Sequence, residues 1–187
     1  MSQREEVDRR RIEQFLNALG QRFTRPGRIY LVGGTTLVWE GLRSQTIDVD
    51  LAFDISPEDT DGFTRAVRML KQELAINVEE VSPGDFIPLP AGYRERSLFI
   101  GRFGSLEVFH FDLYSTALSK IERGRDEDLS DVLTLLTTGR IDMAQLVECF
   151  EGILPRVETH SLKGDPIEFS QKFETLKQMW QETSKRG

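Results

Sequence analysis

The fold is decided by the stretch LVGGTTLVWEGLRSQTIDVDLAF, residues 31–53. The apolar run at residues 29–32 predicts a short buried strand, and Gly33-Gly34 follows it directly. Helical spacing of apolar residues resumes over residues 35–42. Over residues 46–53 apolar and acidic side chains alternate, which is typical of a strand with one apolar face and one acidic face. The stretch therefore predicts a strand, a glycine turn, a helix and a second strand.

Two features of this stretch suit a phosphate and a cation. Gly33 and Gly34 stand where a strand meets a helix, so the backbone can approach a ligand closely and amides at a helix start attract anions. Asp48 and Asp50 are two residues apart on a strand, so their carboxylates project from one face. Their mutual repulsion favours a bound cation, and Mg²⁺ commonly takes one or two carboxylates and completes its shell with phosphates. Each feature alone is usually structural, and it is the combination that indicates a site.

The rest of the pattern predicts an α+β fold with a mixed sheet and with most helices in the C-terminal third. We expect helices at residues 5–20, ended by Gly20, at 56–74, capped by Ser56, and repeatedly from Tyr114 onward. We expect strands at 76–81, 98–103 and 106–113, the last two as a hairpin, and a long loop at 82–96.

Composition limits the classes of protein. The 187 residues carry 24 Lys and Arg against 31 Asp and Glu, a net charge of −7, which disfavours coating nucleic acid with the whole surface but allows local binding. The single Cys149 excludes an internal disulfide and a multi-cysteine zinc site. With only His110 and His160 as histidines, we expect carboxylates to hold any metal. The sequence has no apolar leader and no membrane-length run, so we expect a cytoplasmic protein.

Residues 31–35 and Asp48-Val49-Asp50 resemble the glycine signature and the first two metal carboxylates of the nucleotidyltransferase superfamily, the DNA polymerase beta-like minimal fold. The resemblance implies a mixed β-sheet flanked by helices. It also implies a third carboxylate on a later strand between hydrophobic neighbours, and Phe111-Asp112-Leu113 matches that pattern. Asp112 equally suits another role, the N-cap of a helix that begins near Tyr114.

Residues 118–131 resemble a subset of small bacterial nucleotidyltransferases that includes toxins of abortive-infection toxin–antitoxin pairs. The shared pattern is a helix with a lysine, here Lys120, then a basic turn, here Arg123-Gly124-Arg125, then Asp-x-x-Asp opening the next helix. Lysine or arginine would neutralise phosphate oxygens that a metal leaves uncovered. The alternative is a run of solvent-exposed helix charges paired with nearby acids: Glu122, Asp126 and Asp128.

The resemblance implies a metal-dependent transfer of an NMP from an NTP to an acceptor, which could be an RNA end, a protein hydroxyl or a small molecule. Two Mg²⁺ ions would bind Asp48, Asp50 and Asp112, and Lys120 would complete the catalytic set. The expected nucleotide-binding residues are Gly33, Gly34, Thr35, Arg43, Thr46, Arg123 and Arg125.

We expect a nucleotidyltransferase-like domain over residues 1–138 and a helical extension over 139–187 packed on it. By analogy, the expected protein partner is an antitoxin or a second copy of the chain. We expect no contact with a membrane. The alternative function is a catalytically idle nucleotide-binding or protein-interaction domain on the same fold, although the intact acidic residues argue against it.

Overall fold

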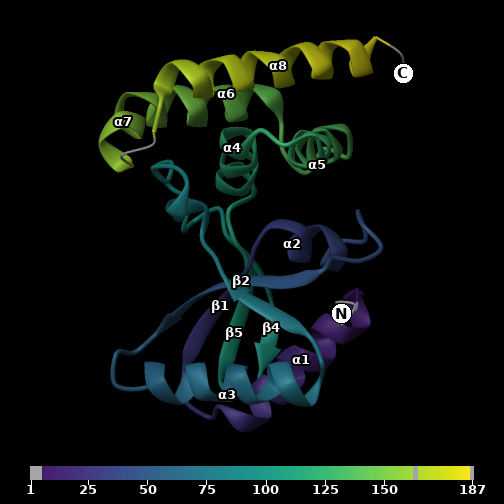
Figure 1. Cartoon of the computed structure of the whole chain (residues 1–187), viewed down its shortest axis with the longest axis vertical. Helices are drawn as coiled ribbons and strands as arrows, with labels where there is room; N and C mark the ends of the chain where they lie inside the picture. The colour runs from purple at the N-terminus through teal and green to yellow at the C-terminus, as the bar shows by residue number, and fades with distance from the viewer. Residues whose placement is uncertain (1–5, 162–163, 186–187) are drawn as a thin grey trace. The chain divides into compact units, whose positions relative to one another are not determined.

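The computed structural model of the chain describes residues 6–161 and 164–185, and its elements are labelled in Figure 1. The chain forms two compact units. Unit 1 comprises the residues up to Ser82 together with Ser97–Phe111, and unit 2 comprises Pro83–Arg96 together with the chain from Asp112 onward.

Unit 1 is built on a mixed five-stranded sheet of order β3-β2-β1-β5-β4. Its strands are β1 (Gly27–Leu31), β2 (Asp48–Ile55), β3 (Asn77–Glu80), β4 (Leu98–Phe103) and β5 (Leu106–His110). Strand β1 pairs antiparallel with β2 and parallel with β5, while β3 pairs parallel with β2 and β4 pairs antiparallel with β5. The α+β class, the strands and the hairpin are confirmed, although β5 ends at His110 instead of residue 113.

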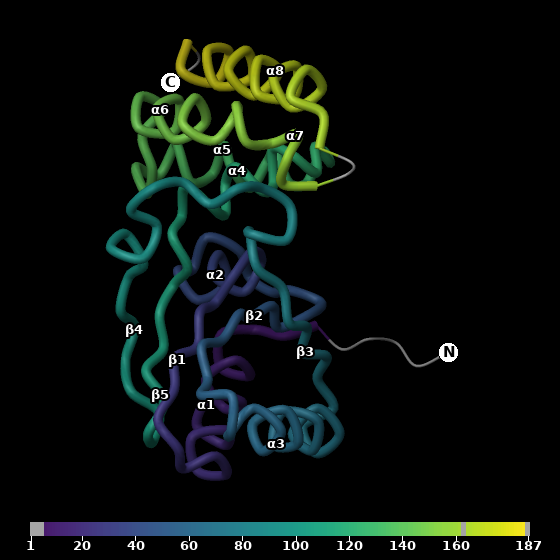
Figure 2. The backbone as a smooth tube through the Cα atoms, turned by 90° about the vertical axis from the view of Figure 1, so that its left-hand side faces the viewer, coloured from purple at the N-terminus to yellow at the C-terminus, as the bar shows by residue number. Residues whose placement is uncertain are grey.

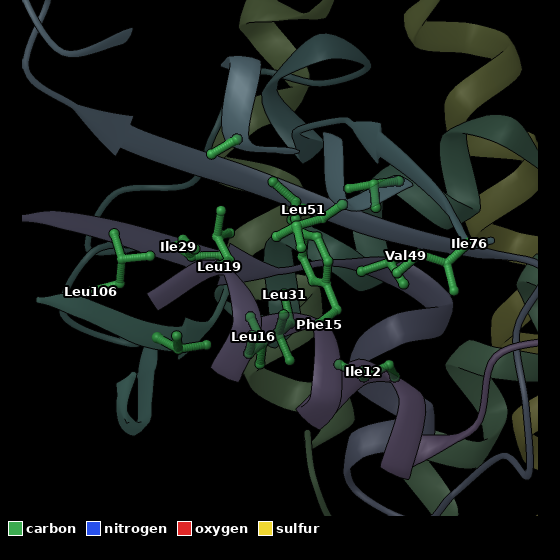
Figure 3. Packing of buried hydrophobic residues seen from close by; sticks show 14 of the residues in the cluster. Ile12, Phe15, Leu16, Leu19, Ile29, Leu31, Val49, Leu51, Ile76 and Leu106 are labelled. Atoms are coloured by element: carbon green, nitrogen blue, oxygen red, sulfur yellow. The ribbon is translucent and has the colours of Figure 1, made fainter. Parts of the chain in front are cut away.

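The hydrophobic core of unit 1 lies between the sheet and two helices, α1 (Arg9–Arg22) and α3 (Thr60–Glu73), which pack side by side (Figure 2). A third helix, α2 (Gly33–Trp39), follows β1 directly. Figure 3 shows the apolar side chains that meet in this core: Ile12, Phe15, Leu16, Leu19, Ile29, Leu31, Val49, Leu51, Ile76 and Leu106. Because strand residues alternate, the side chains between these core positions project from the opposite face of the sheet.

Two expectations about helix ends are wrong. Gly20 does not end α1; a Cβ placed on it would lie 2.3 Å from the carbonyl oxygen of Phe103, so glycine is needed where the helix crosses the β4–β5 turn. Helix α3 begins at Thr60, not beside Ser56. The carbonyl of Ser56 accepts hydrogen bonds from the Asp59 amide at 2.9 Å and the Thr60 hydroxyl at 3.1 Å, so residues 56–59 form a turn before the helix.

Unit 2 is helical. Its α-helices are α4 (Leu113–Arg123), α5 (Asp126–Thr137), α6 (Met143–Ile153), α7 (Val157–His160) and α8 (Pro166–Ser184). The long α8 packs against both α4 and α5, and α6 packs against α4. The chain therefore divides after Phe111 and not after residue 138, because α4 and α5 share their core with the C-terminal helices.

The loop that precedes Ser97 belongs to unit 2. It contains a 3₁₀ turn at Pro83–Asp85, and a second such turn at Leu154–Arg156 lies between α6 and α7. The guanidinium of Arg156 donates to the carbonyl of Leu89 at 3.1 Å, which fastens the loop to that second turn. Across the described parts of the chain, no helix combines the length and the apolar character that crossing a membrane requires.

Candidate functional site

The glycine turn and the two aspartates meet in unit 1, where β1 passes into α2. Gly33 has a φ of +57°, a left-handed conformation that glycine adopts without strain. A Cβ at this position would also lie 3.2 Å from Oδ2 of Asp50. The amide of Val32 donates to the carbonyl of Asp50 at 3.1 Å, which holds the turn against β2. The left-handed backbone therefore favours glycine at position 33, and a side chain there would crowd the carboxylate of Asp50.

Thr35 fastens α2 to the strand that carries the aspartates. Its hydroxyl accepts a hydrogen bond from the amide of Asp50 at 2.8 Å and donates to the carbonyl of Asp48 at 3.4 Å. The side chain is fully buried. The hydroxyl thus bridges the backbone of the two acidic residues and fixes the glycine turn relative to them. Its expected contact with a nucleotide stays a prediction.

Asp48 and Asp50 lie half-buried on one face of β2. Asn77, the register partner of Asp48 on β3, donates from its side-chain amide to Oδ1 of Asp48 at 2.7 Å. Carboxylate oxygens are hard ligands, and two of them with water or phosphate oxygens suit Mg²⁺. Among the residues that the structure describes, no three His, Cys, Asp or Glu side chains gather at a metal-binding distance. A metal ion at Asp48 and Asp50 stays a prediction.

Gly34 allows two further predicted residues to approach the turn. A Cβ there would lie 2.8 Å from the hydroxyl oxygen of Thr46 and 3.2 Å from Nη1 of Arg43. The backbone of Thr46 exchanges hydrogen bonds of 2.7 and 2.9 Å with Val7, which fixes the chain just before β2. Unit 1 thus brings together seven of the predicted site residues: Gly33, Gly34, Thr35, Arg43, Thr46, Asp48 and Asp50.

His110 has no site role in the sequence analysis, yet it supports this turn. It is buried at the end of β5, with Nε2 2.9 Å from Oε1 of Glu40 and Nδ1 3.3 Å from the hydroxyl oxygen of Thr36. The Thr36 hydroxyl lies 2.9 Å from the carbonyl of Leu31, to which it donates. His110 therefore joins α2 to the central strands. No sequence signal links it to Glu40, which lies 70 residues earlier.

Asp112, the predicted third metal carboxylate, belongs to unit 2 and caps α4. Its fully buried carboxylate accepts from the amides of Tyr114 and Ser115 at 3.3 and 3.2 Å and from the Ser115 hydroxyl at 2.6 Å. Arg96 donates to both of its oxygens at 2.9 Å, and this hydrogen bonding raises the pKa of the Arg96 guanidinium. The N-cap role is confirmed. The metal role stays a prediction, and a cation bound there would compete with Arg96.

Lys120 lies in a buried ionic cluster between α4 and α5. Its ammonium is 3.2 Å from Oδ1 of Asp128 and 2.7 Å from Oδ2 of Asp131, and Arg123 also pairs with Asp128. The Lys120 side chain is only 5% exposed, so the solvent exposure in the alternative is wrong for this residue, whereas its pairing with Asp128 is confirmed. Arg125 is exposed and directly precedes α5. Contacts of Lys120, Arg123 and Arg125 with a nucleotide stay predictions.

Comparison with protein families identifies the family of the chain. A family model described as "Nucleotidyltransferase of unknown function (DUF6036)" covers residues 10–186, which include both units. A search of curated proteins and a search of solved structures found no match. The matched range includes the mixed sheet, the glycine turn and the paired aspartates described above. The chain belongs to this family of nucleotidyltransferases of unknown function.

Proposed function

We propose that the chain is a magnesium-dependent nucleotidyltransferase that moves an NMP from an NTP to an acceptor. One observation carries the proposal: Asp48 and Asp50 project from one face of β2 directly beside a glycine turn, in a chain that belongs to a nucleotidyltransferase family. The acceptor oxygen displaces pyrophosphate from the α-phosphorus in an in-line substitution.

Asp48 and Asp50 would hold Mg²⁺, which when bound supplies positive charge to the phosphate oxygens. The absence of a side chain at Gly33 would let the triphosphate approach the backbone of the turn, whereas the space beside Gly34 holds Thr46 and Arg43. Thr35 keeps the two aspartates in register with that turn through its hydrogen bonds to their backbone. Arg43, which lies against Gly34, offers a cation to oxygens that remain uncovered.

The acceptor belongs to one of three classes: an RNA end, a protein hydroxyl or a small molecule. Transfer of a labelled α-phosphate distinguishes these three classes of acceptor. The protein is incubated with cell extract, MgCl₂ and each NTP labelled at the α-phosphate, and the labelled product is identified after separation. By analogy with the toxin–antitoxin proteins that residues 118–131 resemble, we propose an antitoxin or a second copy of the chain as the protein partner.

The experiment that tests the function compares three aspartate variants in this labelling assay. We expect Asp48→Asn and Asp50→Asn to lose transfer by at least a hundredfold, because each removes a charged ligand. The control is Asp54→Asn, since Asp54 lies on the same face of β2 but near its other end, and is exposed. Wild-type transfer by Asp50→Asn would contradict the proposal. Nucleotide binding by the wild type without transfer to any acceptor would favour the idle domain.

A further inference from the structure

An aromatic row crosses three strands of the sheet in unit 1. Tyr30 on β1 is the register partner of Phe109 on β5, and Phe109 is in turn the partner of Phe99 on β4. The rings of Tyr30 and Phe109 are stacked with centroids 5.5 Å apart, and Phe99 meets Phe109 edge to face at 5.3 Å. We call these three residues the aromatic platform.

The platform lies on the face of the sheet that carries the two aspartates. Tyr30 pairs with Ala52 of β2, and Ala52 is two residues beyond Asp50, so all three side chains project from one face. In an antiparallel pair such a diagonal separation is about 7–8 Å. The aromatic row therefore begins beside Asp50 and extends away from it across β1, β5 and β4.

The platform is open at its outer end. The Phe99 side chain is 59% exposed, although it is a large apolar group, and Tyr30 and Phe109 are half-buried. By contrast, Ile29 and Val108, which directly precede Tyr30 and Phe109 on their strands, are fully buried in the core on the other face. The guanidinium of Arg28 lies over the Phe109 ring, 5.9 Å from its centroid. Nucleobases stack on accessible aromatic rings, often with an arginine beside them, and Phe99 offers such a ring at the end of the row.

We propose that the aromatic platform stacks a nucleobase of the nucleotide whose phosphate is held at Asp48 and Asp50. This inference rests on the proposed function, because it is the phosphate site that makes a nucleotide the occupant. A base stacks through its π-face irrespective of its identity, so the platform predicts affinity with little base preference. The base comes either from the incoming NTP or from the end of a single-stranded nucleic-acid acceptor, and the two sources share this chemistry.

The test uses Phe99→Ala, because Phe99 is the most exposed member of the platform. The matched control is Leu98→Ala: the neighbouring Leu98 is 52% exposed, but it projects from the opposite face of the strand. Binding is measured directly with CaCl₂ in place of MgCl₂. One series titrates each of the four NTPs by calorimetry, and the other titrates a fluorescein-labelled single-stranded RNA octamer by anisotropy.

We expect Phe99→Ala to weaken binding at least about fivefold, at the lower end of the known effect of removing one stacking aromatic residue. Leu98→Ala should stay within twofold of the wild type, and Phe99→Trp should bind at least as tightly as the wild type. A loss confined to the NTP series assigns the platform to the incoming base, and a loss confined to the RNA series assigns it to the acceptor. Unchanged binding of both ligands by Phe99→Ala, or no binding of either by the wild type, would overturn the proposal.

The result is separable from that of the proposed function. Full transfer activity that depends on Asp50, together with unchanged binding by Phe99→Ala, would contradict the stacking role of the platform and support the proposed function. Weakened binding by Phe99→Ala without transfer to any acceptor would support the stacking role of the platform and contradict the proposed function.

Discussion

Arg96 and Asp112 form a bidentate ion pair, in which Nε of the arginine lies 2.9 Å from Oδ1 of the aspartate and Nη2 lies 2.9 Å from Oδ2. The pair ties the end of the loop at residues 83–96 to the first turn of α4. Because Asp112 is fully buried, removing its partner leaves a carboxylate with only the hydrogen bonds of the helix cap.

Arg96→Ala should therefore destabilise the protein by about 2 kcal/mol, less than the value typical of a fully buried pair because the Arg96 side chain is 26% exposed. Urea unfolding followed by circular dichroism measures this difference. The control is Arg94→Ala, at an exposed arginine of the same loop, which should change the free energy of unfolding by less than about 0.5 kcal/mol. Equal effects of the two variants would show that the ion pair contributes nothing specific.

The Lys120 cluster gives a second stability prediction. Lys120→Met keeps the length of the side chain but leaves the carboxylates of Asp128 and Asp131, which are only 6% and 10% exposed, without their shared cation. Breaking a buried ion pair in this way costs about 3–5 kcal/mol. The exposed Arg125→Ala should melt like the wild type. A melting temperature of Lys120→Met equal to that of the wild type would contradict the buried cluster.

The two parts of the candidate site differ in how far the sequence could predict them. The common face of Asp48 and Asp50 follows from strand alternation, and the left-handed turn at Gly33 follows from the glycine pair at the strand–helix junction, so both could be predicted from local pattern. The N-cap role of Asp112 could be read as one of two alternatives, because short-range geometry permits both. The pairing of Asp112 with Arg96 could not be predicted, since the loop at residues 83–96 has no periodic pattern to place it.

The errors in the fold have the same origin. Gly20 carries the local signal of a helix end, but the reason for the glycine is the backbone of Phe103, more than eighty residues away in sequence. The boundary after residue 138 follows a glycine that separates two helices, whereas the division after Phe111 depends on the packing of α8 against α4 and α5. Tertiary contacts of this kind leave no periodic pattern in the sequence.

A pH dependence is expected at the start of α6. Asp142 accepts a hydrogen bond from the amide of Gln145 at 2.8 Å and another from the hydroxyl of Tyr114 at 3.0 Å. The backbone hydrogen bond from Gln145, followed by that from Tyr114, lowers the pKa of Asp142. A carboxyl whose pKa is lower in the folded state stabilises the fold above its unfolded pKa of about 3.9, and this contribution is lost as the pH falls through the folded value.

Asp142→Ala should therefore be less stable than the wild type at pH 7, and the difference in the free energy of unfolding should shrink steadily below about pH 4. Urea unfolding of both proteins from pH 7 to pH 3 measures it. The control is Glu151→Ala, at an exposed carboxylate within α6. A difference between wild type and Asp142→Ala that stays constant with pH would show that the aspartate does not act through its charge.

The last prediction separates the two reasons for a glycine at position 33. Gly33 and Gly41 both have left-handed backbones, with φ values of +57° and +72°, but only at Gly33 would a Cβ meet another group, Oδ2 of Asp50. Gly33→Ala and Gly41→Ala should therefore both lose about 1 kcal/mol of stability from backbone strain. Only Gly33→Ala should also disturb the carboxylate, and so lower both the stabilisation of the protein by MgCl₂ with NTP and the transfer of label.

Melting temperatures with and without MgCl₂ and NTP, measured alongside transfer at a temperature where both variants are folded, distinguish the two effects. Gly41→Ala supplies the effect of strain alone, so any additional loss in Gly33→Ala is assigned to the crowding of Asp50. If both variants retained the same ligand-induced stabilisation and the same rate of transfer, the closeness of Gly33 to the carboxylate would have no functional consequence, and the placement of the phosphate beside this turn would be wrong.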